Sequence, residues 1–68
     1  IGVGEISFTY RGSRPSDVIV RDIMGRSVKE FTDVRPGTTL RFGNAVPSGV
    51  YFISIKGESK INRVTLVK

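Results

Sequence analysis

Along most of the chain, apolar and polar residues alternate with a period of two, which is typical of half-buried β-strands. Ile6, Phe8 and Tyr10 alternate with polar residues, and a segment rich in β-branched residues follows at 18–23. Further strands are predicted at 26–31, 38–42, 50–56 and 60–67. No window carries a convincing apolar stripe with the 3.6-residue period of a helix. The pattern therefore predicts an all-β chain.

Residues that favour turns separate the expected strands. Gly, Pro, Ser and Asp cluster at 12–16, 33–37, 46–49 and 57–59. In the segment 22–25, Asp22 suits the first position of a type I turn, and Gly25 accepts the positive φ that closes a bulged hairpin. Short strands joined in this way favour an antiparallel sandwich or a small barrel. We expect residues 2–4 to form a flexible lead-in.

The strongest expected strand is 50–56, because apolar residues occupy both of its faces. Tyr51 and Ile53 share one face and Phe52 lies on the other. We therefore expect this strand to be central and packed on both sides. The Tyr51 hydroxyl is expected to reach the rim of the core for a hydrogen bond. Three other aromatic side chains in the inward phase of their strands are expected in the core: Phe8, Tyr10 and Phe42.

The length and composition exclude most enzyme classes. A chain of 68 residues has room for a single domain, spanning 1–68. Because it has no His and no Cys, it lacks an imidazole base, a thiolate nucleophile, a disulfide and the usual zinc ligands. The six carboxylates lie mostly in or beside turns, where they are expected to cap turns or face solvent. We predict a non-enzymatic module with no metal and no cofactor.

The charge favours anionic partners in general. Eleven Lys and Arg against six Asp and Glu give a net charge of +5. Nucleic-acid binding would require exposed aromatic side chains among the basic ones, whereas these aromatics are expected inside, so no nucleic-acid partner is predicted. No apolar stretch is long enough to span a membrane. The chain starts with Ile1 and not with Met, so we expect a fragment of a longer secreted protein.

Three segments together resemble the C-terminal sorting domains of the type IX secretion system. Residues 18–28 are similar to the family's strand-turn-strand segment V-x-I-Y-D-x-x-G-R-x-V, with Arg21 where an aromatic residue is common. Residues 47–55 resemble its P-x-G-V-Y-x-x-x-I segment. Residues 60–68 resemble its terminal K-x-x-K-x-x-V-x-K tail, with Asn62 and Arg63 where a second Lys often stands. The three segments occur in the family's order.

The resemblance implies a fold and a function. The fold would be a small antiparallel immunoglobulin-like β-sandwich of six to seven short strands. The domain would direct an attached cargo protein across the outer membrane, from the periplasm to the cell surface or into the medium. Its partners would be the outer-membrane translocon, a shuttle protein and a cell-surface sortase, and the cargo would be joined to anionic lipopolysaccharide. The domain itself would catalyse nothing.

Under this interpretation, the final strand and the turn before 50–56 form the recognition site. Gly49 and Tyr51 are expected to shape the site, although a turn glycine more often answers a backbone need. Five residues are expected to contact the partner: Lys60, Arg63, Val64, Val67 and Lys68. For Val64 and Val67, simple packing in the core is the alternative role.

Two further expectations remain open. The first is an alternative function, a structural or carbohydrate-binding sandwich attached to an extracellular enzyme, for which Phe31 and Phe52 are the candidate ring platforms. The second concerns association, because short β domains with apolar edges can exchange strands. An isolated copy could therefore form a strand-swapped dimer.

Overall fold

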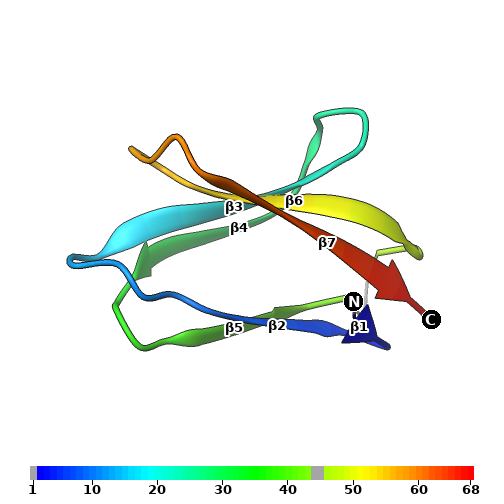
Figure 1. The fold of residues 1–68 in the computed structure, drawn as a ribbon, viewed down its shortest axis with the longest axis horizontal. Coiled ribbons are helices and arrows are strands. Elements are labelled where there is room, and N and C mark those ends of the chain that lie inside the picture. The colour runs from blue at the N-terminus through cyan, green and yellow to red at the C-terminus, as the bar shows by residue number, and fades with distance from the viewer. Residues whose placement is uncertain (1, 44–45) are drawn as a thin grey trace.

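The computed structural model describes residues 2–43 and 46–68, and its regular structure consists of strands (Figure 1). The strands are β1 (Gly2–Val3), β2 (Ile6–Thr9), β3 (Ser16–Asp22), β4 (Ser27–Val34), β5 (Thr39–Phe42), β6 (Gly49–Ile55) and β7 (Ile61–Val67). Across the described residues, no helix has the length and apolar character needed to cross a membrane.

The strands form two sheets that pack face to face. The larger sheet has the order β1-β7-β6-β3-β4, and the smaller one consists of β2 and β5. All pairings are antiparallel except that of β1 with β7. β3, β6 and β7 correspond to strands C, F and G of an immunoglobulin sandwich, β4 to strand C′, and the β2-β5 pair to strands B and E. This order confirms the predicted small β-sandwich.

The core lies between the sheets because alternate residues of each strand point inward. Val20 is paired with Ile53 across β3 and β6, and both side chains are 1% exposed. The rings of Phe42 and Tyr51 meet edge to face, with centroids 5.8 Å apart, and so join the two sheets. Within 2–43 and 46–68, the buried apolar residues are Ile6, Tyr10, Val18, Val20, Val34, Leu40, Phe42, Tyr51, Ile53 and Leu66.

The expected flexible lead-in is wrong, because Gly2–Val3 is a strand. Gly2 and Val3 pair in parallel with Leu66 and Val67. The pairing continues where the Gly4 N–H donates to the Val67 carbonyl at 2.7 Å. A two-residue strand held by backbone groups has no alternating side-chain pattern, so the sequence carries no signal for it.

β4 is longer than expected, because it runs through the position at which the turn was predicted to begin. Val34 is 5% exposed and belongs to the core. Asp33 adopts a φ of 51°, and its N–H donates to Asp17 Oδ1 at 3.1 Å. The pairing of β3 with β4 shifts register between Ser16 and Val18. This irregularity lets the strand continue beyond Asp33, a residue type that usually favours turns.

β6 is central in the sheet, but the prediction that it is packed on both sides is wrong. Its inward residues Tyr51 and Ile53 are buried, whereas Val50 and Phe52 on the outer face are only half-buried. The β2-β5 pair covers the inner face of the large sheet (Figure 1). Within the described part of the chain, no second layer covers the outer face, so its apolar side chains remain accessible.

Candidate partner-binding groove

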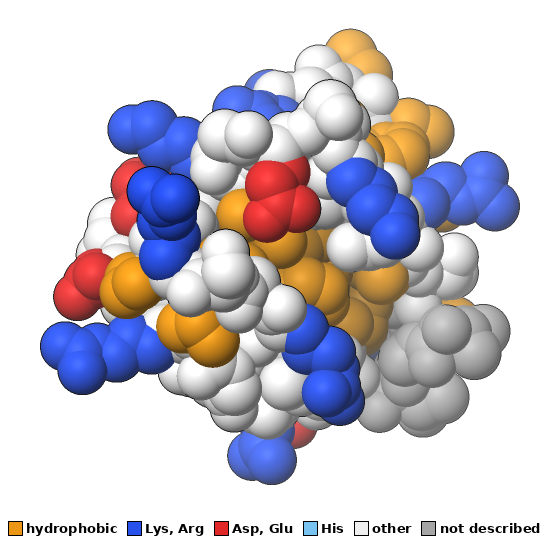
Figure 2. Space-filling view, turned by 60° about the vertical axis from the view of Figure 1, so that its left-hand side comes forward, with side chains coloured by type: hydrophobic (Ala, Val, Ile, Leu, Met, Phe, Trp, Pro, Cys, Tyr) orange, Lys and Arg blue, Asp and Glu red, His pale blue; other side chains and the backbone are white. Residues whose placement is uncertain are grey.

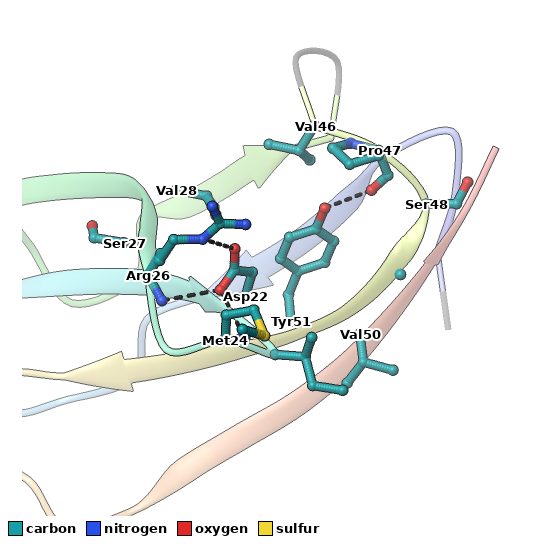
Figure 3. A pocket seen from close by; sticks show the side chains of 12 residues that line it. Asp22, Met24, Arg26, Ser27, Val28, Val46, Pro47, Ser48, Val50 and Tyr51 are labelled. Atoms are coloured by element: carbon teal, nitrogen blue, oxygen red, sulfur yellow. Dashed lines mark hydrogen bonds and ion pairs between the residues drawn. The ribbon is translucent and has the colours of Figure 1, made fainter.

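A groove of about 580 Å³ opens at one end of the sandwich, between the β3-β4 turn and the loop before β6 (Figure 3). The turn and the loop are brought together because β3 and β6 are neighbours, with Asp22 paired to Tyr51. The residues that line the groove are Asp22, Ile23, Met24, Arg26, Ser27, Val28, Val46, Pro47, Ser48, Gly49, Val50 and Tyr51. We call this the groove end of the molecule.

The first wall of the groove is a tight turn held by the Asp22 carboxylate. Oδ1 accepts hydrogen bonds from the backbone N–H groups of Met24 and Arg26 at 2.9 and 3.0 Å. Oδ2 accepts one from Arg26 Nε at 3.0 Å. Gly25, at a φ of 84°, closes the turn and donates its N–H to the Asp22 carbonyl. The Asp and Gly positions therefore act as the sequence predicted, and hydrogen bonds hold the turn together.

These contacts also decide the charge of the carboxylate. The backbone N–H of Arg26, together with the Arg26 guanidinium, holds the pKa of Asp22 below its ordinary value of 3.8, although partial burial opposes the shift. Asp22 is therefore ionised and already satisfied by its own turn. Among the described residues, no cluster of acidic side chains could hold a metal ion.

The second wall is the loop before β6, which is fixed by Tyr51. Its hydroxyl donates to the carbonyl of Pro47 at 2.5 Å, and its ring is 3% exposed (Figure 3). This confirms the predicted hydrogen bond of Tyr51. A tyrosine near the start of the sixth strand that bonds to the backbone just upstream corresponds to the tyrosine corner of immunoglobulin-like sandwiches. Ser48 Oγ accepts a further bond from the Lys68 N–H at 3.0 Å.

The rim of the groove carries the most exposed apolar side chains of the described chain. Ile23 is 74% exposed and Met24 is 75% exposed, both at the tip of the β3-β4 turn. Arg26 stands beside them with a side chain that is 77% exposed. Only its Nε donates to Asp22, so within the described part of the chain the other guanidinium nitrogens remain available at the rim. The groove thus combines an apolar lip with a cation.

The structure brings to the groove end both residues expected to shape the site and two of the five expected to contact a partner. Gly49 and Tyr51 line the groove itself. Val64 lies opposite Tyr51 on β7 and packs against the core, so its alternative role as a packing residue describes its position better. Val67 is 40% exposed, and the following Lys68 is bonded to the loop of the groove.

Two predicted contact residues lie elsewhere. Lys60 precedes β7 at its far end, beside a separate hollow lined by Phe8, Ile55 and Glu58 among others. Arg63 lies opposite Phe52 on the outer face of the large sheet. Neither residue lines the groove.

Sequence reasoning missed the other wall of the groove. Asp22 and Met24 were recognised only as parts of a turn, and Arg26 only as the first residue of the strand predicted at 26–31. A signal was present, because two of the segments that carry the family resemblance, 18–28 and 47–55, contain the two walls. What the sequence does not show is that these walls face each other, which depends on the pairing of β3 with β6.

The two aromatic residues considered for carbohydrate binding do not form a platform. Phe31 is paired with the inward Val18 and packs on the core, under the Lys29 ammonium at 5.6 Å. Phe52 is paired with the outward Arg21. The two rings therefore lie on opposite faces of the large sheet, an arrangement that does not favour stacking along a sugar chain.

Comparisons with models of protein families, with curated proteins and with solved structures found no match for the chain.

Proposed function

We propose that this domain is a recognition tag that directs an attached cargo protein across the outer membrane through the type IX secretion system. The proposal starts from the resemblance of three segments to the sorting domains of that system. One structural observation supports it beyond the sequence. Segments 18–28 and 47–55, which are distant in the chain, supply the two walls of a single groove, and the end of segment 60–68 lies beside it.

The groove has the properties of a surface that another protein binds. Both walls are held by hydrogen bonds within the domain, so little conformational entropy is lost when a partner binds. The exposed Ile23 and Met24 side chains offer apolar area, and Arg26 offers a cation for a carboxylate. The partners would be the shuttle protein, the translocon and the sortase of the system.

A deletion of residues 60–68 would be a poor test, because it removes β7. This strand lies between β1 and β6 and contributes Leu66, which is 1% exposed, to the core. The truncated domain would lose its fold, and a secretion defect could not be assigned to recognition.

A sharper test places a large side chain at the margin of the groove without touching the core. Ser27 is exposed, lines the groove and begins β4, while Thr32 is exposed on the same strand outside the groove. We expect a reporter that carries the domain with Ser27→Trp to remain in the periplasm of a bacterium that has the secretion system. The matched Thr32→Trp fusion should reach the cell surface.

Fractionation of cells and surface protease accessibility measure the outcome. Both purified domains must show the wild-type midpoint of unfolding, so that the comparison concerns binding alone. Equal surface delivery of the two fusions, or failure of the wild-type domain to deliver the reporter, would contradict the proposal.

A further inference from the structure

At the groove end, exposed apolar side chains continue from the β3-β4 turn onto the outer face of the large sheet. We call this set the apolar edge. Ile23 and Met24 project from the turn, and Val50 is half-buried on the outer side of β6. Val67 follows at the end of β7, 40% exposed. Three of the four large hydrophobic side chains that are exposed in the described chain therefore lie at this one end. The fourth, Ile61, is at the opposite end of β7.

One row behind this edge, two arginines flank an aromatic ring. Phe52 is paired with Arg21 of β3 on one side and with Arg63 of β7 on the other. Directly opposed residues on neighbouring strands point to the same face, so the three side chains form a row across the sheet. Arg21 and Arg63 are exposed and Phe52 is half-buried. We call this the arginine row.

The arginine row lacks acidic partners in the described structure. Among the described residues, the Arg21 guanidinium makes one hydrogen bond, from Nη1 to Ser54 Oγ at 3.2 Å. The two ion pairs found among the described residues involve Arg26 and Arg41, and neither Arg21 nor Arg63 takes part in one. Both guanidinium groups are therefore available to an external anion.

The distance between the apolar edge and the arginine row suits a partner in which an apolar layer lies next to an anionic one. Residues two apart on a strand are separated by about 7 Å, so the arginine row lies about that distance behind Val50. A lipid surface has the same order, with acyl chains inside and phosphate groups outside. Arginine pairs readily with phosphate oxygens, and an aromatic ring is favoured at the boundary between the two layers.

We propose that the groove end and the arginine row bind the surface of an anionic phospholipid bilayer. Ile23 and Met24, held outward by the Asp22 turn, insert among the first acyl carbons. Arg21 and Arg63 then contact the headgroup phosphates. A fluid lipid layer can surround these two side chains, because they are about three-quarters exposed at the tip of the turn. The net charge of +5 favours approach to the same surface.

Co-sedimentation of the purified 68-residue chain with vesicles tests the proposal. We expect binding to vesicles that contain phosphatidylglycerol, falling with added salt, and at least about tenfold weaker binding to pure phosphatidylcholine. Arg21→Gln and Arg63→Gln should each weaken binding about fivefold. The control pair Arg11→Gln and Arg35→Gln removes exposed charges elsewhere and should weaken it less.

The apolar edge is tested by a second set of variants. The double substitution Ile23→Ser and Met24→Ser should weaken binding about tenfold or more, whereas Ile61→Ser, at the 60% exposed control position, should have little effect. Because the chain contains no Trp, the emission of a Met24→Trp variant reports this site alone. It should shift to shorter wavelength on phosphatidylglycerol vesicles, and that of Ile61→Trp should not.

Three results would overturn the proposal. The first is no binding of the wild-type chain to phosphatidylglycerol vesicles at low salt. The second is equal binding of the Ile23, Met24 and Ile61 serine variants. The third is an effect of Ile23→Ser and Met24→Ser on self-association alone, measured by ultracentrifugation, which would assign the apolar edge to a protein contact. The proposal does not depend on the export role, because vesicle binding and reporter delivery are measured separately.

Discussion

At each end of the sandwich, the hydroxyl of a buried tyrosine anchors a loop by a hydrogen bond, but the surfaces of the two ends differ. At the groove end, the Tyr51 hydroxyl donates to the carbonyl of Pro47, four residues upstream. At the other end, the Tyr10 hydroxyl donates to the carbonyl of Arg14, four residues downstream, at 2.6 Å. Both rings are almost completely buried. In each case a buried tyrosine ties a loop to the core.

The surfaces beyond these anchors differ in chemistry. The hollow next to Tyr10 is lined mainly by polar and charged residues, including Ser13, Arg14, Lys56 and Glu58. Figure 2 brings this end forward and shows Lys and Arg side chains projecting around it. The groove end instead exposes Ile23 and Met24. The anchors are therefore devices of the fold, and function has to be sought in what projects beyond them.

The largest expected effect breaks the anchor at the Tyr10 end. A Cβ added at Gly12 would overlap the Tyr10 ring, which is 1% exposed and packed in the core. We expect Gly12→Ala to destabilise the domain by about 3–5 kcal/mol, comparable to the loss of a buried aromatic side chain. Denaturant unfolding measures this, with the exposed Ser13→Ala as the control. A midpoint equal to that of the control would show that the loop yields instead.

A smaller effect is expected when each anchor loses only its hydroxyl. Tyr10→Phe and Tyr51→Phe each leave a carbonyl without its partner, which should cost about 1–3 kcal/mol. We expect similar losses in the two variants, because the two bonds have similar lengths and burial. Thermal unfolding of both variants under the same conditions makes the comparison. A clear loss in one variant only would mean that the two anchors are not equivalent.

The dependence of stability on pH distinguishes the two ends, because Asp22, whose pKa is lowered, lies at the groove end. Folding lowers the pKa of Asp22 through its hydrogen bonds from Arg26. Its contribution to stability is therefore complete above the ordinary value of 3.8 and is lost as the pH falls from there through the lowered pKa. We expect Asp22→Asn to flatten this part of the stability profile, measured by denaturant unfolding between neutral and acidic pH. An unchanged acid slope would count against the role of Asp22.

The smallest expected effect on stability concerns the exposed tip. Ile23 and Met24 are about three-quarters exposed, so replacing both by serine should change the free energy of unfolding by no more than about 0.5 kcal/mol. Thermal unfolding, under the conditions used for the tyrosine variants, measures this change in stability. A large loss would show that the tip supports the fold, and would remove the argument that it is kept exposed for a partner.

The limits of sequence reasoning follow from what side-chain alternation can report. Alternation located the six longer strands and the inward phase of Tyr10, Phe42 and Tyr51, because these features depend on burial. It did not locate β1, which backbone groups hold, nor the end of β4, where a positive φ at Asp33 lets the strand continue. Turn chemistry predicted the β3-β4 hairpin. It could not predict the groove, which exists because the β3-β4 turn and the loop before β6 lie at the same end of two neighbouring strands.

The pairing of β1 with β7 has a mechanical consequence. The two strands run in parallel, and both ends of the described chain lie at the same side of the molecule (Figure 1). Tension applied to the polypeptide on either side would draw Gly2–Val3 and Leu66–Val67 past each other along a common axis. Their hydrogen bonds, with that from Gly4 to Val67, would then have to break together and not one after another. β1, the shortest strand, is therefore the first element on which a pulling force would act.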